Sequence, residues 1–125
     1  MHDRPLATPC ALICGGELVV TVGSGKGSGG RNQEFALSMA PRIAGSGRIV
    51  AASADSDGSD GPTEQAGGIV DGLTMERLGA LGVDYFARMA QHDSEGALRT
   101  LDDTLDTGVR GTNVQDLRVV YVAGK

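Results

Sequence analysis

The stretch CALICGGELVVTVGSGKGSGGRNQEF, residues 10–35, passes from apolar runs through a glycine-rich loop into a helix. Residues 10–22 hold two apolar bursts separated by a Gly-Gly pair, which predicts two strands or one interrupted strand. Residues 31–43 have the composition of a helix, and we expect Pro41 to end or kink it. A strand, a loop and a helix in succession are typical of an α/β protein.

The rest of the chain continues this alternation. Apolar runs predict strands over residues 48–54 and 117–123, and residues 67–71 are expected to form a short strand or a turn. Between residues 71 and 117 we expect short helices, over residues 74–82, 84–90 and 94–105. The predicted fold is therefore an α/β layered domain with a mixed, largely parallel sheet flanked by helices.

The domain organisation is expected to be simple. Residues 1–9 carry two prolines and no periodicity, which predicts a loose N-terminal arm. Residues 10–125 are expected to form a single domain without an internal linker, and a chain of 125 residues is long enough to bury a core.

Composition excludes several classes of function. The net charge is −5 and aromatic residues make up 3%, so neither the basic footprint nor the stacking side chains of a nucleic-acid binder are present. No apolar run approaches the roughly 20 residues that a membrane span needs, and no signal peptide is apparent, so we expect a cytoplasmic protein. Cys10 and Cys14 do not have the spacing of a zinc site or a CxxC motif.

The glycine-rich loop matches GxGxxG at Gly25, Gly27 and Gly30, a pattern typical of dinucleotide binding, but it fails the Walker pattern. More generally, a glycine loop that leads into a helix N-terminus offers backbone N–H groups to an anion. Lys26 and Arg31 would add positive charge there. The alternative is a surface loop whose two cations are simply solvated.

Two later loops also carry polar side chains. The first is ADSDGSDGPTE, residues 54–64, which lacks the glycine and glutamate positions of a calcium-binding hand. Its carboxylates are suited to holding Mg²⁺ through water, binding substrate hydroxyls or acting as a general base, or else they are turn and capping acids. The second is GTN, residues 111–113, where Thr112 and Asn113 offer neutral donors or form a plain turn.

Four segments in this order resemble the MOFRL domain, the C-terminal domain of the glycerate 2-kinase family, whose members also carry the name hydroxypyruvate reductase. They are GGE (15–17), GKGSGGRNQEFAL (25–37), SADSDGSDGPTEQAGGIVDG (53–72) and GTNVQDLRVVYV (111–122). The resemblance runs from about residue 10 to residue 123. It implies an enzyme that transfers the γ-phosphoryl group of ATP, with Mg²⁺, to the 2-hydroxyl of D-glycerate.

The resemblance places the active site in a cleft between this domain and a larger, nucleotide-binding N-terminal domain. The residues it assigns to catalysis are Arg31, Asp57 and Asp60, and the last two are also the candidate metal ligands. Together with the chemistry of the glycine loop, it gives as substrate- or phosphate-binding residues Lys26, Gly29, Gly30, Asn32, Glu34, Thr112 and Asn113. The chain departs from the family at His92, where the family commonly has an amide.

We therefore expect this chain to be the substrate- and phosphate-binding part of a glycerate 2-kinase. The resemblance implies that it would be inactive without the N-terminal, nucleotide-binding domain of that family. One alternative is a hydroxypyruvate reductase that uses NAD(P)H. The other is a non-catalytic, stand-alone module that binds a ligand or a partner protein. Glycerate or a similar small hydroxy acid and the N-terminal kinase domain are the expected partners, and a homodimer is left open.

Overall fold

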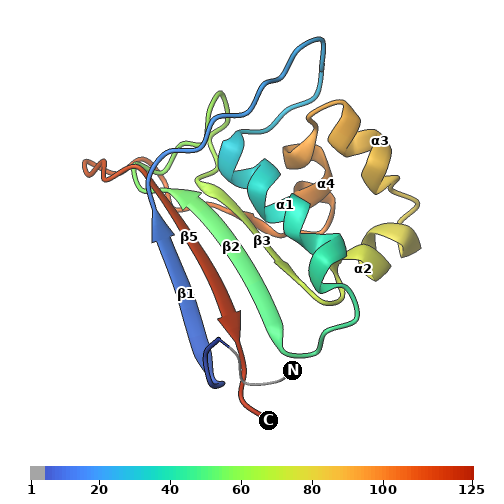
Figure 1. Cartoon of the computed structure of the whole chain (residues 1–125). Helices are drawn as coiled ribbons and strands as arrows, with labels where there is room; N and C mark the ends of the chain where they lie inside the picture. The colour runs from blue at the N-terminus through green and yellow to red at the C-terminus, as the bar shows by residue number, and fades with distance from the viewer. Residues whose placement is uncertain (1–4) are drawn as a thin grey trace.

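The computed structural model describes residues 5–125, in which a five-stranded sheet carries four helices on one face (Figure 1). The spatial order of the strands is β1-β5-β2-β3-β4. The strands are β1 (Cys10–Gly15), β2 (Ile49–Asp55), β3 (Gly67–Asp71), β4 (Thr104–Leu105) and β5 (Asp116–Val122). The helices are α1 (Arg31–Ile43), α2 (Thr74–Ala80), α3 (Tyr85–Ala90) and α4 (Ser94–Thr100).

Neighbouring strands of this sheet are all antiparallel, so the prediction of a mixed, largely parallel sheet is wrong. β1 and β2 do run in the same direction with α1 between them, as the strand–helix–strand pattern predicted. However, β5 lies between them and pairs antiparallel with both. The alternation of strands and helices along the sequence shows only that β1 is followed by α1 and then β2. It does not show that β5, from the other end of the chain, lies between β1 and β2. The helices also cover one face of the sheet and do not flank it on both sides (Figure 1).

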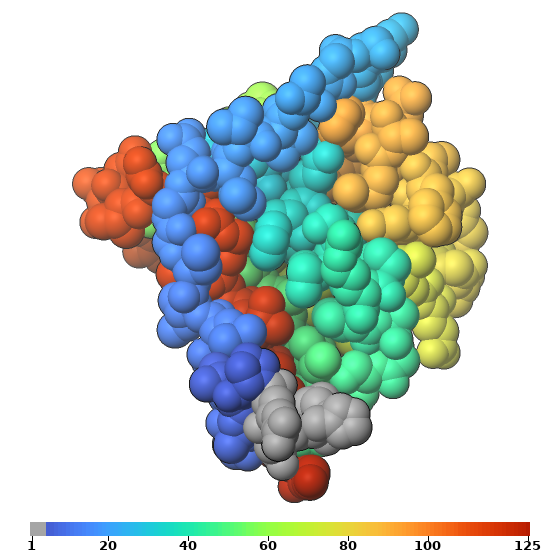
Figure 2. All heavy atoms as spheres, viewed as in Figure 1, coloured from blue at the N-terminus to red at the C-terminus, as the bar shows by residue number. Residues whose placement is uncertain are grey.

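Several predicted boundaries shift in the structure. Only the first apolar burst of residues 10–22 forms a strand, and the chain after β1 runs on without regular structure and projects from the molecule (Figure 2). Pro41 lies inside α1, which continues to Ile43. The last helix ends at Thr100 because Asp102 adopts a positive φ of 59°, and Leu105 joins β4.

Of the predicted arm, residues 1–4 lie outside the described residues, and residues 5–9 contain neither helix nor strand. Across residues 5–125, no helix combines the length and apolarity that crossing a bilayer requires.

The core lies between α1 and the central strands. α1 buries Ala36, Leu37, Ala40 and Ile43, a spacing that places one apolar face of the helix against the sheet. Ala51 of β2 and Val70 of β3 form the sheet side of this contact, together with Leu98 of α4. The short side chains allow α1 to lie close to β2 and β3, so its N-terminus stands at a fixed position over one end of the sheet.

Gly67 provides a test of how tightly β2 and β3 pack. A Cβ atom at Gly67 would lie 1.8 Å from the Ser53 carbonyl oxygen, whereas one at the helical Gly79 would meet nothing within 4 Å. We expect Gly67→Ala to lower the free energy of unfolding by about 3 kcal/mol through overpacking. Gly79→Ala should raise it by about 0.5–1 kcal/mol through helix propensity. Urea unfolding measures both, and similar effects of the two variants would contradict this packing.

Candidate functional site

Asp60 holds the N-terminus of α1 from the loop that follows β2. Its side chain is fully buried. Oδ1 accepts hydrogen bonds from the Asn32 backbone N–H (3.0 Å) and the Asn32 side-chain amide (3.1 Å), and Oδ2 accepts one from the Gln33 N–H (2.8 Å). A Cβ atom at Gly30, the residue before the helix, would lie 2.3 Å from the Asp60 Cγ. The anion at this helix N-terminus is therefore the protein's own carboxylate.

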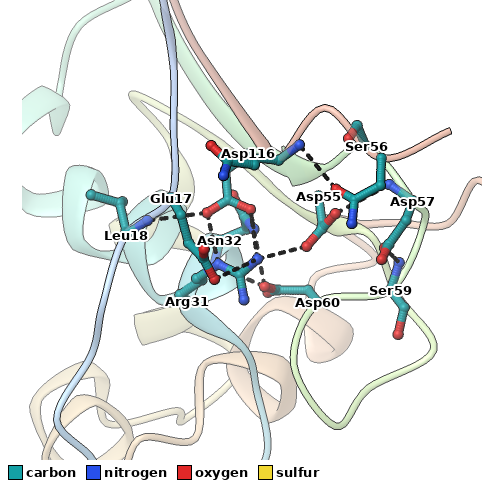
Figure 3. Close-up of polar contacts among 12 residues, drawn as sticks. Glu17, Leu18, Arg31, Asn32, Asp55, Ser56, Asp57, Ser59, Asp60 and Asp116 are labelled. Atoms are coloured by element: carbon teal, nitrogen blue, oxygen red, sulfur yellow. Dashed lines mark hydrogen bonds and ion pairs between the residues drawn. The ribbon is translucent and has the colours of Figure 1, made fainter.

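Arg31, the first residue of α1, joins two carboxylates from neighbouring strands (Figure 3). Its Nε and Nη2 donate to the two oxygens of Asp116 at 2.7 and 2.9 Å, a bidentate pair. Nη2 also donates to Asp55 Oδ2 at 2.7 Å. The Asn32 side-chain amide donates to Asp116 Oδ1 at 2.9 Å, which links this cluster to the buried cap below it.

The two carboxylates respond to this environment in opposite directions. Burial raises the pKa of Asp55, although Arg31 opposes the shift. Burial alone would also raise the pKa of Asp116, but hydrogen bonds from Arg31, Asn32 and the Leu18 N–H outweigh it and lower that pKa. The hydrogen bond to Asp116 in turn raises the pKa of Arg31, so the guanidinium keeps its charge.

An open polar cavity of about 360 Å³ lies directly above this cluster. Segments far apart in the sequence contribute to its wall: the stretch after β1, the start of α1, the acidic loop and the loop before β5. The lining residues are Glu17, Arg31, Asp55, Asp57, Ser59, Gly61, Asn113 and Gln115. Their carboxylate, amide, hydroxyl and guanidinium groups suit a small, hydroxyl-rich ligand.

The loop before β5 is fixed against the acidic loop by backbone contacts. Ser56 Oγ accepts a hydrogen bond from the Val114 N–H (2.8 Å), and the Ser56 N–H donates to the Gln115 carbonyl oxygen (3.0 Å). The Arg110 N–H donates to the Asp57 carbonyl oxygen at 2.7 Å. These contacts bring the predicted residues Asn113 and Asp57 to the same cavity as Arg31. Thr112 is exposed and lies outside the lining set.

The glycine-rich loop packs on the turn between α3 and α4. The Gly27 N–H donates to the Gln91 carbonyl oxygen (2.8 Å), and a Cβ atom at Gly27 would lie 2.4 Å from the Cβ of Asp93. Gly29 has a φ of +150° and passes so close to Ser94 that a Cβ there would lie 2.1 Å from its Oγ. Gly27 of the GxGxxG match and the neighbouring Gly29 are therefore used for contacts within the protein.

The predicted residues of the GGRNQE segment divide between two sides of α1. Arg31 reaches the cavity, while Glu34 contacts His92, whose Nδ1 lies 2.9 Å from Glu34 Oε1. Lys26 is exposed on the glycine-rich loop, away from the lining residues. Gly30 and Asn32 lie below the cavity, where they contact Asp60.

Magnesium was expected at Asp57 and Asp60. Within residues 5–125, no group of three or more acidic, histidine or cysteine side chains is placed to hold a metal ion. Both Asp60 oxygens already accept hydrogen bonds from α1, and Asp57 Oδ1 accepts one from the Ser59 N–H at 2.9 Å. The described residues thus do not fit a metal centre of their own, and the metal role of these two aspartates stays a prediction.

Sequence reasoning missed Glu17, Gln115 and Asp116. Asp116 is 1% exposed and stands at the first position of β5, where it pairs with Asp55 at the start of the β2–β5 register. The available signal was an acidic residue directly before the alternating apolar run of residues 117–123. Its meaning depends on β5 lying beside β2, which the sequence pattern did not predict.

Comparisons with known proteins agree with one another. A model of the MOFRL family matches residues 10–116. The D-glycerate 2-kinase of Thermotoga maritima is 52% identical over 115 residues, which cover 92% of this chain and 27% of that protein. A protein of Agrobacterium vitis provisionally named a hydroxypyruvate reductase is 38% identical over 119 residues, 94% of this chain and 27% of its own length.

Solved structures give the same result. The crystal structure of glycerate kinase from Thermotoga maritima superposes with a TM-score of 0.93 at 50% identity, covering 97% of this chain and 29% of that one. The chain thus spans little more than a quarter of the length of these relatives.

The Asp60 cap can be tested by substitution. Asp60→Ala leaves buried N–H groups of α1 without acceptors, so we expect the free energy of unfolding to fall by about 3 kcal/mol. Glu64→Ala, which removes an exposed carboxylate from the same loop, is the matched control and should change stability by less than about 0.5 kcal/mol. Chemical denaturation followed by circular dichroism measures both, and equal losses would contradict the capping role.

The lowered pKa of Asp116 predicts a pH dependence of stability. Its ionised form is favoured in the folded protein, so its contribution is present above the unfolded pKa of about 4 and is lost as pH falls through the folded pKa. The free energy of unfolding of Asp116→Asn should therefore fall less between pH 7 and pH 3 than that of the unmodified protein. Urea titrations at both pH values measure this, with Glu64→Gln as control; an unchanged difference would refute the assignment.

Proposed function

Because the chain belongs to the MOFRL family, we propose that it forms the glycerate- and phosphate-binding side of a glycerate 2-kinase. The observation that carries the proposal is the polar cavity built on Arg31, found in a chain 52% identical to a protein named D-glycerate 2-kinase. Since the matched region is 27% of that protein, the activity is proposed for an enzyme in which this fold is one part.

The cavity offers groups that match glycerate. A small hydroxy acid carries hydroxyls, which donate to carboxylates, and one carboxylate, which a guanidinium binds. Glu17, Asp55 and Asp57 supply the acceptors. Within residues 5–125, Arg31 donates its side-chain hydrogen bonds through Nε and Nη2. Its Nη1 is therefore proposed to bind the substrate carboxylate or a phosphoryl oxygen.

The proposed roles follow from position. Phosphoryl transfer needs positioning and charge stabilisation more than covalent chemistry. Arg31 stabilises negative charge, Asp57 accepts the proton of the attacking hydroxyl, and Asn113 orients the substrate. Asp60, Gly30 and Asn32 act indirectly, because they hold α1 and Arg31 in place. Lys26 and Thr112, both exposed, are proposed as phosphate contacts.

The phosphoryl donor is proposed to be ATP with Mg²⁺, which would need ligands in addition to Asp57 and Asp60. The reductase alternative has the name of the Agrobacterium relative in its favour. Against it stands the packing of Gly25 and Gly27 on residues 91–93, because a dinucleotide would need that backbone for its pyrophosphate. The N–H groups of Asn32 and Gln33 are also already bonded to Asp60.

A chimera tests the proposal. The chain would replace the matching region of the Thermotoga glycerate kinase, to which it is 50% identical. We expect ATP-dependent phosphorylation of D-glycerate and no NAD(P)H-dependent reduction of hydroxypyruvate, measured by coupled assays and by product analysis. Reduction without phosphorylation would favour the alternative function and refute the kinase.

Arg31 is tested in the same chimera. Arg31→Lys keeps the charge but loses the bidentate geometry, so kcat/KM should fall by about 100-fold or more. Arg110→Ala removes an exposed cation of the loop before β5 and should leave kcat/KM within about twofold. Thermal unfolding of both variants separates a catalytic loss from a folding defect.

A further inference from the structure

Residues 18–22, LVVTV, have the sequence of a strand but no strand partner within residues 5–125. Three valines and a threonine in a row strongly favour the extended conformation. The exposure alternates from Leu18 to Thr21 as it does along a strand: Leu18 and Val20 are half-buried, whereas Val19 and Thr21 are exposed. Val19 is 91% exposed, so its side chain is accessible to a partner.

This segment is anchored in place beside the candidate site. Two of its backbone groups form hydrogen bonds within residues 5–125. The Leu18 N–H donates to Asp116 Oδ2 at 3.3 Å, and the Val22 carbonyl oxygen accepts a bond from the Gly25 N–H at 3.1 Å. Just before it, Arg118 donates to the carbonyl oxygens of Gly15 (2.8 Å) and Gly16 (3.1 Å). The segment is therefore held at its N-terminal end and followed by a turn, and the backbone groups of residues 19–21 have no partner within residues 5–125.

An unpaired apolar strand is a liability that proteins cover or blunt with charge or proline. Residues 18–22 contain neither, and β1, which leads to them, is an uncharged edge strand with Leu12 and Ile13 exposed. Figure 2 shows the stretch after β1 running across the surface and projecting from it. These are the features of an edge that receives a strand from elsewhere.

We propose that residues 18–22 bind, by strand addition, a β-strand from the part of a glycerate kinase that lies outside the region matched by this chain. That part makes up nearly three quarters of the relatives, so it has the length to supply a strand. Glu17, adjacent to the segment, lines the cavity, so a strand added here would stand at the rim of the site. The inference rests on the proposed function in taking its partner from a two-part enzyme.

Hydrogen exchange on the chimera and on the isolated 125-residue chain tests this pairing. The amides of residues 19–22 should exchange rapidly in the isolated chain and at least about tenfold more slowly in the chimera. Equal exchange in both proteins would overturn the proposal. Protection in the isolated chain that rises with protein concentration would also overturn it, because the partner would then be a second copy.

Two matched variants identify the surface. Val19→Asp and Val109→Asp change valines that are 91% and 90% exposed, so neither should shift the thermal unfolding of the isolated chain. In the chimera, Val19→Asp should restore fast exchange to residues 19–22, and Val109→Asp should not. An equal effect of the two variants would refute a specific role for the segment.

The exchange readout is independent of catalysis. A chimera that phosphorylates glycerate but leaves residues 19–22 unprotected would refute the docking alone. A protected chimera without kinase activity would refute the proposed function and leave the docking in place.

Discussion

The bond between the Asp60 carboxylate and the first N–H groups of α1 is the contact on which the rest of the site depends. It joins the acidic loop to the helix, and the helix is itself packed on β2 and β3. Since the Asn32 side chain donates to both Asp60 and Asp116, the same contacts also fix the position of α1 relative to β5. Arg31 is thereby held between Asp116 of β5 and Asp55 of β2, with its guanidinium group at the cavity.

The charge balance of this cavity bears on what it can bind. Glu17, Asp55 and Asp57 line it against the single cation Arg31, and Asp116 lies beneath. Hydroxyl groups would find acceptors there, whereas an anionic group, whether the carboxylate of glycerate or a phosphoryl group, would be attracted by Arg31 and repelled by the carboxylates. In the proposed kinase, further positive charge for the phosphoryl group would come from Lys26 or from the part of the enzyme outside the matched region.

Local features of the fold followed from the sequence, and long-range ones did not. The apolar spacing in α1 and the short runs of β2 and β3 identified those elements because each pattern reports its own backbone. The position of β5 between β1 and β2 depends on pairing across the whole chain, and no local pattern encodes it. The same limit hid Asp116, whereas the resemblance of GGRNQE and GTN to the MOFRL family brought Arg31 and Asn113 into consideration as site residues.

The glycine-rich loop shows why a motif and its role must be argued separately. Its glycines matched a dinucleotide fingerprint, yet the packing uses them to bring the loop against residues 91–95, which leaves the helix N-terminus to Asp60. Tying the loop down at that turn has a second effect. The chain between β1 and α1 is held at Leu18, which donates to Asp116, and at Gly27, which donates to Gln91, so residues 18–22 cross the surface next to the cavity residue Glu17. The contacts that occupy the glycines of the loop thus leave residues 18–22 without a strand partner within residues 5–125, next to Glu17 of the cavity.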